Sequence, residues 1–372
     1  MTTDAPALGA RQVVFPTAGS MDLRSTEVPE PGASDFVMRV RRVGICATDL
    51  HLFDGHIGDP FPLVPGHEFV GDVARIGADA AAARGLEVGD RIAVEMLLPC
   101  GQCSRCREGR YNICERDDPA LGPAAAREYG VNISRSVEPG LWGGYADYLW
   151  VPAEAIVHRL PADLPWDVAA LVEPLAVAFR AVHRGRVAPG DTVVVIGPGP
   201  VGLLMAAAAK LSGAARVVMV GTRPSRLALS TRFGADTTID SQATTDVASA
   251  VVAALGSLAD VVIEAAGVPS AQTQAATLVR RGGRVVLAGA CGWTADVTFG
   301  SDRDLLTREI DVLPSFLSAG GYEPSIEALS TGAFPFDELI THRFELEEVQ
   351  SAFDLVRHKK DGVVKAVLVL SD

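Results

Sequence analysis

The stretch that decides the fold is Thr192-Val-Val-Val-Ile-Gly197-Pro-Gly-Pro-Val-Gly202. A short apolar strand runs directly into a G-x-G-x-x-G turn, and a helical pattern follows. The glycines allow a tight turn and the close approach of a pyrophosphate, which then lies at the helix N-terminus. An ordinary tight turn is the alternative, but the strand, the helix and a second strand at 216–220 agree. We therefore expect Gly197, Gly199, Pro200, Val201 and Gly202 to bind a dinucleotide cofactor.

The end of that second strand indicates which dinucleotide binds. A protein that selects NAD usually places Asp or Glu about 20 residues past the glycines, where it accepts hydrogen bonds from the ribose 2′-hydroxyl. Here the segment is Gly221-Thr222-Arg223-Pro224. The missing carboxylate removes repulsion against a 2′-phosphate, and Arg223, with Arg226, can pair with it. We predict NADP rather than NAD, although Arg223 alone also fits a solvated loop charge.

Strand and helix patterns alternate from Pro189 onward, and strands without polar alternation predict a parallel sheet covered on both faces. From about Gln12 to Val157 the pattern is short β-rich segments between turn signals, typical of an antiparallel β domain with function in its loops. We assign the tail back to this first domain. The expected domains are 1–185 together with 318–372, and 186–317.

Composition narrows the class of protein. The 372 residues carry a formal net charge of −13, and 48% are hydrophobic, which indicates a globular chain. Negative charge without a basic run argues against nucleic-acid and membrane-surface partners. The N-terminus has no export signal, and the longest apolar run, 193–209, is broken by glycine and proline. We therefore expect a cytoplasmic protein with a small-molecule substrate.

Four of the six cysteines fall close together, as Cys100-x2-Cys103-x2-Cys106-x7-Cys114. Such clustering favours metal binding in a reducing compartment. Four thiolates can enclose one tetrahedral Zn²⁺ and leave no position for water or substrate, so this metal would be structural. An iron–sulfur cluster or free thiols are the alternatives.

A second constellation comes earlier in the chain. Cys46 lies in Gly44-Ile-Cys-Ala-Thr-Asp-Leu-His51, and His67 with Glu68 follows Gly66. A thiolate, an imidazole and a carboxylate would supply three ligands to zinc and leave the fourth position open, as in a catalytic site. Singly, Cys46 and His67 would also fit a buried apolar position and a hydrogen-bonded turn.

With these residues assembled, the chain resembles the zinc-containing medium-chain alcohol or polyol dehydrogenases. The resemblance spans nearly the whole chain, through GICATDLH, PGHEFVG, GDRIAVE, CGQCSRCREGRYNIC, VEPLAVA, GPGPVG and THRFELEEVQSAF. It implies an α/β protein with a GroES-like β-rich catalytic domain and a Rossmann domain with a doubly wound parallel sheet. It also implies an active site between the domains, two zinc ions per chain, and a homodimer or homotetramer.

The resemblance also assigns roles to individual residues. Cys46 and His67 match the ligands of the catalytic zinc, and Glu68 and Glu173 match two acidic positions. Since Cys46 and one carboxylate already neutralise Zn²⁺, we expect only one of the two glutamates to bind it at a time. Thr48 matches the hydroxyl that bonds the substrate oxygen. His51 matches the outer end of a proton relay, although a surface histidine also fits it.

Substrate specificity is where the chain departs from the polyol enzymes. Sorbitol-type relatives tend to carry Arg after the Phe of the segment at 314–318, whereas this chain has Leu317. A pocket less polar than a polyol site is one interpretation, with Phe53, Ile57, Phe61, Trp142 and Phe316 as its candidate lining. The alternative is that these residues pack the core and that His56 or Glu128 recognises hydroxyls.

We therefore expect a zinc-dependent oxidoreductase that transfers a hydride between NADP(H) and a secondary alcohol or ketone. An NAD(P)-dependent polyol or sugar dehydrogenase is the first alternative. A catalytically silent cofactor-binding protein is the second, although its usual mark, a broken metal set or a damaged glycine turn, is absent from the sequence.

Overall fold

The computed structural model describes residues 8–118, 120–121, 126–292 and 295–370. These fold into two compact units, one formed by 1–173 and 340–372 and the other by 174–339. The sequence placed the boundaries at 185–186 and 317–318. In the structure the first boundary lies earlier, between residues 173 and 174, at the beginning of the continuous helix α5 (Val172–Arg184). The second differs because α10 (Tyr322–Thr331) packs with the second unit, where Gly321 lies against Ala176.

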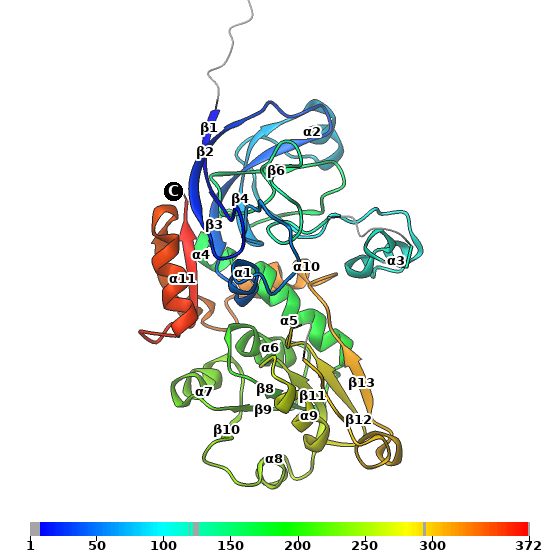
Figure 1. The fold of residues 1–372 in the computed structure, drawn as a ribbon. Coiled ribbons are helices and arrows are strands. Elements are labelled where there is room, and N and C mark those ends of the chain that lie inside the picture. Colours follow the sequence, from blue (N-terminus) through cyan, green and yellow to red (C-terminus); the bar gives the residue numbers. More distant parts are fainter. Residues whose placement is uncertain (1–7, 119, 122–125, 293–294, 371–372) are drawn as a thin grey trace, which may run out of the picture. The chain divides into compact units, whose positions relative to one another are not determined.

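The first unit is built on a largely antiparallel sheet, of which Figure 1 labels β3, β4 and β6. The strand order is β14-β15-β3-β4-β5-β7, and β6 also pairs with β3. A separate hairpin joins β1 to β2. The strands are β1 (Leu8–Val14), β2 (Asp22–Val28), β3 (Phe36–Gly44), β4 (Glu68–Ile76), β5 (Arg91–Val94), β6 (Tyr148–Val151), β7 (Val157–Arg159), β14 (Ile340–Glu345) and β15 (Lys365–Val369). The helices are α1 (Ala47–Phe53), α2 (Ala78–Arg84), α3 (Ser104–Arg107), α4 (Trp166–Ala169) and α11 (Val349–His358).

The C-terminal strand explains why the chain returns to the first unit. β15 lies between β14 and β3, pairing in parallel with the former and antiparallel with the latter, so that Val367 faces Gly44. β3 in turn pairs with β4 and places Gly44 opposite Glu68. Three segments far apart in sequence therefore meet at one end of the sheet.

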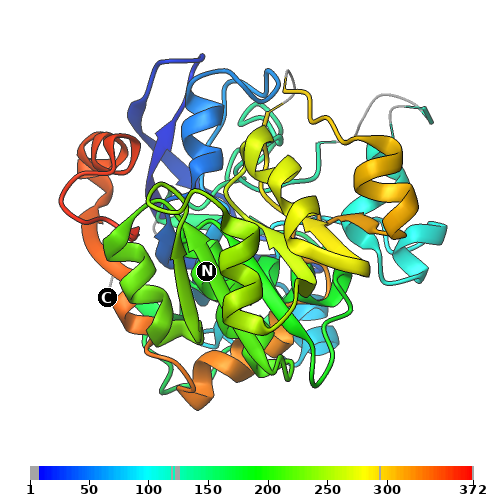
Figure 2. The same cartoon turned by 90° about the horizontal axis from the view of Figure 1, so that it is seen from below.

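The second unit has a six-stranded parallel sheet in the order β10-β9-β8-β11-β12-β13. Its strands are β8 (Thr192–Ile196), β9 (Arg216–Gly221), β10 (Thr237–Asp240), β11 (Ala259–Glu264), β12 (Val279–Leu287) and β13 (Asp311–Pro314). Its further helices are α6 (Pro200–Leu211), α7 (Pro224–Ser230), α8 (Val247–Leu255) and α9 (Pro269–Leu278), and helices flank the sheet (Figure 2). This is the doubly wound parallel sheet that the sequence predicts.

Along the strands of this sheet apolar residues do not alternate with polar ones, because both faces of the sheet are buried. Val194, Val218, Val262 and Val285, from four strands, belong to one core cluster. The sequence pattern missed the short strands β10 and β13. No helix in the described parts of the chain has the length and apolar character that a membrane span requires.

Candidate functional site

Cys46, His67 and Glu68 lie together at one end of the first unit's sheet. Cys46 caps the N-terminus of α1 shortly after β3, whereas Glu68 is the first residue of the neighbouring strand β4 and His67 immediately precedes it. One donor atom from each residue lies within 4.8 Å of the other two. A Cβ atom on Gly44 would come within 1.9 Å of the Glu68 Oε2 atom, so only glycine leaves room for this carboxylate.

Asp49 organises the thiol and the imidazole, and the sequence analysis gave it no role. Its buried carboxylate accepts hydrogen bonds from the Cys46 backbone N–H (2.8 Å) and from the Tyr145 hydroxyl (2.9 Å). Its other oxygen lies 3.5 Å from His67 Nδ1. Burial opposes a charge on His67, but Asp49 and Cys46 together raise the pKa of His67 well above its usual value. The surroundings of His67 therefore favour positive charge on its imidazole.

Lys365, on β15, is the second residue that sequence reasoning missed. Its ammonium group is buried, forms an ion pair with Glu68 Oε2 and donates to the Ile45 carbonyl oxygen at 3.0 Å. Burial opposes the charge, yet Glu68 and Cys46 raise the pKa of Lys365 above its usual value. A single lysine in an otherwise apolar strand is the sequence signal that could have indicated this buried ion pair.

Glu173 lies in the first turn of α5 and is buried. Among the described residues it is not part of the three-donor group that contains Glu68. Burial raises the pKa of Glu173 to about 7, and the negative charge of Glu68 adds to this effect. The two carboxyl groups thus differ, because Glu68 has an ammonium partner and Glu173 is disposed to hold a proton near neutral pH.

Helix α1 presents the two residues expected to move protons. The Thr48 hydroxyl oxygen lies 3.6 Å from the Cys46 sulfur. His51 is exposed, and its Nδ1 atom lies 3.5 Å from Nδ1 of His56. Thr48 therefore lies beside the three-donor group, whereas His51 lies at the solvent side of the same helix.

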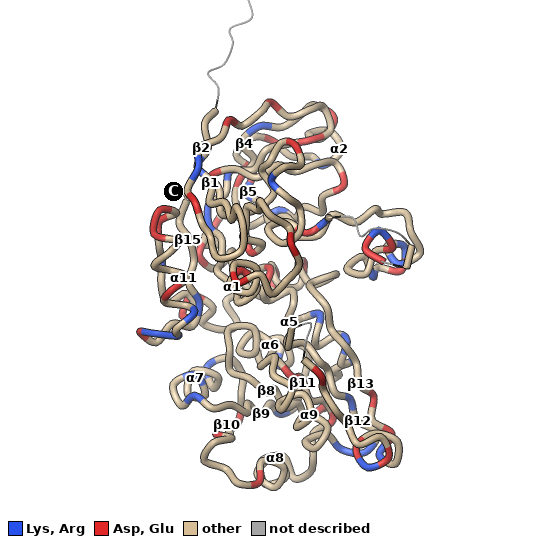
Figure 3. Tube along the Cα trace, viewed as in Figure 1, with Lys and Arg blue, Asp and Glu red and all other residues tan. Residues whose placement is uncertain are grey.

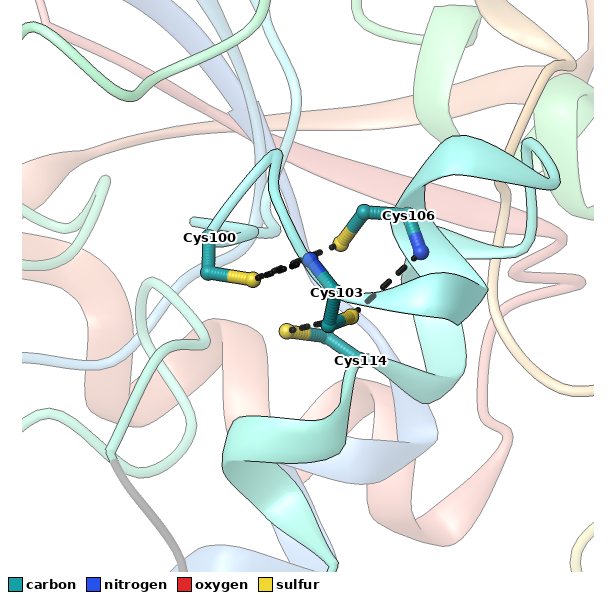
Figure 4. A group of neighbouring side chains, drawn as sticks. All are labelled: Cys100, Cys103, Cys106 and Cys114. Atoms are coloured by element: carbon teal, nitrogen blue, oxygen red, sulfur yellow. Dashed lines mark hydrogen bonds between the residues drawn. The ribbon is translucent and has the colours of Figure 1, made fainter.

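The four lobe cysteines converge around one point, as Figure 4 shows. Backbone N–H groups of Gln102 and Cys103 lower the pKa of the Cys100 thiol to about 6. Burial and the neighbouring sulfur atoms raise the pKa of Cys106 to about 12. Four thiols so close together cannot all ionise without a cation between them, so the donor set fits a metal ion.

The glycine turn connects β8 to α6 as expected. Gly197 has a φ of +106°, and a Cβ atom on Gly202 would lie 1.9 Å from the Gly197 carbonyl oxygen. No heavy atom of the described residues lies within 4 Å of the Cβ position of Gly199, which leaves open space in front of the helix N-terminus. Pro200 and Val201 are the first residues of α6. This open, helix-terminal turn fits a pyrophosphate.

The segment after β9 lies beside this turn. A Cβ atom on Gly221 would come within 2.3 Å of the Pro198 ring. Thr222 is exposed, and Arg223 caps α7, around which Figure 3 marks basic positions. Burial and the neighbouring charge of Arg223 both lower the pKa of Arg226. Two guanidinium groups are thus held near each other despite their repulsion, which favours an anion between them.

Two of the residues expected to line a less polar pocket, the half-buried Phe53 and the buried Trp142, make contacts within the first unit. The Phe53 ring lies 5.3 Å from that of Phe15, and the buried Trp142 donates through its indole N–H to the Val137 carbonyl oxygen at 2.8 Å. Half-buried Ile57 and Phe61 belong to the first unit, whereas the exposed Phe316 and its neighbour Leu317 belong to the second.

Comparisons with known proteins agree with this arrangement. The alcohol dehydrogenase GroES-like domain family matches residues 32–162, and the zinc-binding dehydrogenase family matches 200–331. A Mycobacterium tuberculosis protein named as an alcohol dehydrogenase is 37% identical over 360 residues, which cover 95% of this chain and 96% of the relative. The chain belongs to the zinc-dependent medium-chain dehydrogenase family.

Two further family members are informative. The erythritol/L-threitol dehydrogenase of Mycolicibacterium smegmatis is 36% identical and covers 92% of each chain. A solved zinc-binding dehydrogenase structure from Sinorhizobium meliloti, bound to NADP, has a TM-score of 0.83 and 30% identity, covering 97% of this chain and 99% of that one. These findings confirm the predicted family and fold, and the chain is an oxidoreductase that acts on alcohols.

Proposed function

We propose that this dehydrogenase transfers a hydride between NADP(H) and a secondary alcohol or its ketone at a zinc ion held by Cys46, His67 and Glu68. The observation that carries the proposal is the three-donor group, with its thiol, imidazole and carboxylate within 4.8 Å of one another. Three protein ligands leave one tetrahedral position for water or substrate, as catalytic zinc sites require. Asp49 fixes the orientation of His67, as an outer partner of a ligating histidine does.

When bound there, zinc supplies a Lewis acid for the substrate oxygen. The Thr48 hydroxyl, next to Cys46, would accept the proton of the alcohol while it releases its own proton to the relay, and His51, at the outer end of that relay, would pass a proton to solvent. When the Glu68 carboxylate does not bind zinc, Lys365 neutralises its charge. Glu173 is the second acidic group, and only one of the two glutamates binds zinc at a time.

We assign a second, structural zinc to Cys100, Cys103, Cys106 and Cys114, in a reducing, cytoplasmic setting. The geometry of the four thiols supports this assignment. Metal analysis of the purified enzyme separates the proposal from a silent cofactor-binding protein, because we expect about two zinc ions per chain. A protein with lobe zinc alone would favour the silent alternative.

The NADP preference rests on Arg223 and Arg226 and on the absence of an acid in the segment from Gly221 to Thr222. Replacing Arg223 by Ala should raise the KM for NADP(H) about tenfold and leave the KM for NAD(H) unchanged. Arg216→Ala, an exposed position at the start of β9, is the matched control. A wild-type enzyme that uses both cofactors equally would contradict the assignment.

A polyol substrate is the second candidate, and Glu128 is the observation that favours it. Burial raises the pKa of this partly exposed carboxyl group, and the charge of His67 acts in the opposite direction. This effect of His67 supports a position of Glu128 near the three-donor group. Rates of NADP⁺ reduction with cyclic, aromatic and aliphatic secondary alcohols should be compared with those for erythritol and sorbitol. A site built around buried hydroxyl partners rejects analogues that lack them by orders of magnitude, so the ranking identifies the substrate class.

We also propose that the enzyme assembles as a homodimer or homotetramer. Light scattering on the purified protein measures the molar mass, and a monomer of 39.0 kDa would contradict this expectation.

A further inference from the structure

Glu264 is a buried carboxyl group that the chemistry above does not use. It ends β11, which lies beside β8 in the parallel sheet. The strand order reverses between these two strands, since β9 and β10 follow on one side and β12 and β13 on the other. Dinucleotides bind outside the carboxyl ends of the strands at this reversal.

The two halves of the cofactor can be assigned to the two sides of the sheet. The glycine turn follows β8, and the segment at 221–226, which would hold the adenosine ribose and its phosphate, follows β9. The nicotinamide half must then extend over the loops that follow β11 and β12. Glu264 lies at the base of these two loops.

The carboxyl group and the backbone of Glu264 tie the two loops together. Oε1 accepts hydrogen bonds from the N–H groups of Ala266 (2.7 Å) and Gly267 (2.9 Å) in the first loop. The Glu264 carbonyl oxygen accepts from Ala288 (3.0 Å) and Gly289 (2.9 Å) in the second. Both loops are therefore positioned by one residue.

Close packing keeps this carboxyl group near the cofactor turn. A Cβ atom on Gly197, in the turn after β8, would lie 2.7 Å from the Ala266 nitrogen. One on Gly289 would lie 2.3 Å from the Gly267 nitrogen and 2.9 Å from Glu264 Oε2. The segments after three adjacent strands thus contact one another, with Glu264 among them.

The negative charge of the Glu264 carboxylate has no cationic partner among the described residues. Glu264 has no exposed surface, and no ion pair involves this residue within the described part of the chain. Burial raises the pKa of Glu264, while the N–H groups of Gly267 and Ala266 and, to a smaller extent, the Gln272 side chain and the Gly289 N–H lower it. Its charge also reaches the next loop, because burial and then the Glu264 charge raise the pKa of the Cys291 thiol.

We propose that Glu264 favours the oxidised cofactor over the reduced one. The oxidised nicotinamide ring carries a positive charge that the reduced ring lacks, and a buried carboxylate without a cationic partner attracts the charged ring. Glu264 is thus a positioning residue that also sets the preference for a redox state. This inference rests on the proposed use of NADP(H).

Equilibrium binding tests it without turnover. The dissociation constants of NADP⁺ and NADPH are measured at pH 8.5 by fluorescence for the wild type and for Glu264→Gln, which retains the acceptor oxygen. We expect the ratio Kd(NADP⁺)/Kd(NADPH) to rise about tenfold in the variant. Glu323→Gln, an exposed position on α10, should leave the ratio unchanged.

A second variant separates the charge from the loop contacts. Glu264→Asp keeps the charge but shortens the side chain, so it should weaken both affinities and leave their ratio near that of the wild type. It also provides the test if Glu264→Gln does not fold. A ratio that shifts in the Asp variant, or one that does not shift in a folded Gln variant, overturns the inference. A wild type that binds neither NADP⁺ nor NADPH would instead refute the proposed function.

Discussion

The four-cysteine lobe and the three-donor group at Cys46 are both suited to a metal ion, but the chain builds them in opposite ways. The lobe takes all its donors from one short stretch, 100–114, around the four-residue helix α3. The three-donor group takes Cys46 from the start of α1 and His67 with Glu68 from β4, and it is bordered by Lys365 from β15.

The chemistry of the two regions differs in the same way. Four sulfur donors fill a tetrahedral shell, and their nearest polar partners are backbone N–H groups of the same loop. At Cys46 the donors are mixed, and buried charged groups, Asp49 and Lys365, surround them. A local, closed set is suited to holding a loop, whereas a set assembled from distant strands can leave one position free for chemistry.

The largest expected effect comes from Cys46→Ser. Loss of a thiolate ligand should reduce kcat at least about thousandfold, or about 4 kcal/mol, because the substrate oxygen loses its Lewis acid. The zinc content should fall from about two ions to about one per chain, with NADPH binding retained. If turnover survives the loss of this zinc, the metal at Cys46 is not catalytic, and the two regions do not differ in that respect.

Lys365→Met tests the buried charges around the three-donor group. Removing the ammonium leaves Glu68 buried without its partner, and the free energy of unfolding should fall by about 3 kcal/mol in urea titrations. Lys365→Arg should recover part of this loss. Tyr111→Phe, which removes a hydroxyl that donates to Glu95 beside the lobe, should lower stability by only about 1 kcal/mol. Equal losses in the Met and Phe variants would contradict the comparison.

Cys103→Ser addresses the lobe itself. Loss of its metal should destabilise the protein by about 2 kcal/mol, because the ordered loop loses its main cross-link. The measurements are thermal unfolding and zinc content, with kcat determined on the fraction that remains folded. That kcat should stay within about twofold of the wild type, and a loss as deep as that of Cys46→Ser would mean that the lobe is catalytic.

The smallest effect concerns Glu128, which interacts electrostatically with His67 of the three-donor group and with Asp117, three residues beyond the lobe. Burial, with the added charge of Asp117, raises the pKa of Glu128 from 4.5 to about 7. The folded protein thus holds this proton up to about pH 7 while the unfolded chain releases it near pH 4.5, so stability falls as pH rises across that window. The full shift corresponds to about 3 kcal/mol, and solvent screening at this partly exposed side chain reduces the expected gain of Glu128→Gln over the wild type to about 1 kcal/mol at pH 8, with no gain at pH 4. A gain that is independent of pH would exclude this ionisation as its cause.

Short-range patterns predicted the parts of the molecule that are local in sequence. The glycine turn at 197–202, the strands at 192–196 and 216–220, and the spacing of the four cysteines all describe neighbours along the chain. Their geometry follows from turn chemistry and from the short reach of a loop. The alternating strands and helices gave the parallel sheet for the same reason.

The missed features depend on pairing between distant segments. Nothing near Lys365 indicates that β15 lies beside β3, and nothing near Asp49 indicates that Tyr145 donates to it. Trp142 was a candidate for a pocket because apolar character does not distinguish a pocket wall from the interior, in which it is buried. The strand β2 was missed because its side chains are mostly exposed or half-buried and carry no apolar stripe.

The position of Lys365 on β15 has a consequence for biosynthesis. Cys46, His67 and Glu68 emerge from the ribosome early, but the residue that neutralises the buried Glu68 carboxylate emerges only after the whole second unit has been made. Until β15 has been made, burial of the Glu68 carboxylate would leave its charge without a partner, and β3 lacks its neighbouring strand. A nascent chain can therefore form its glycine turn and its lobe during translation, whereas the three-donor group and its buried ion pair are complete only after the last strand has been made.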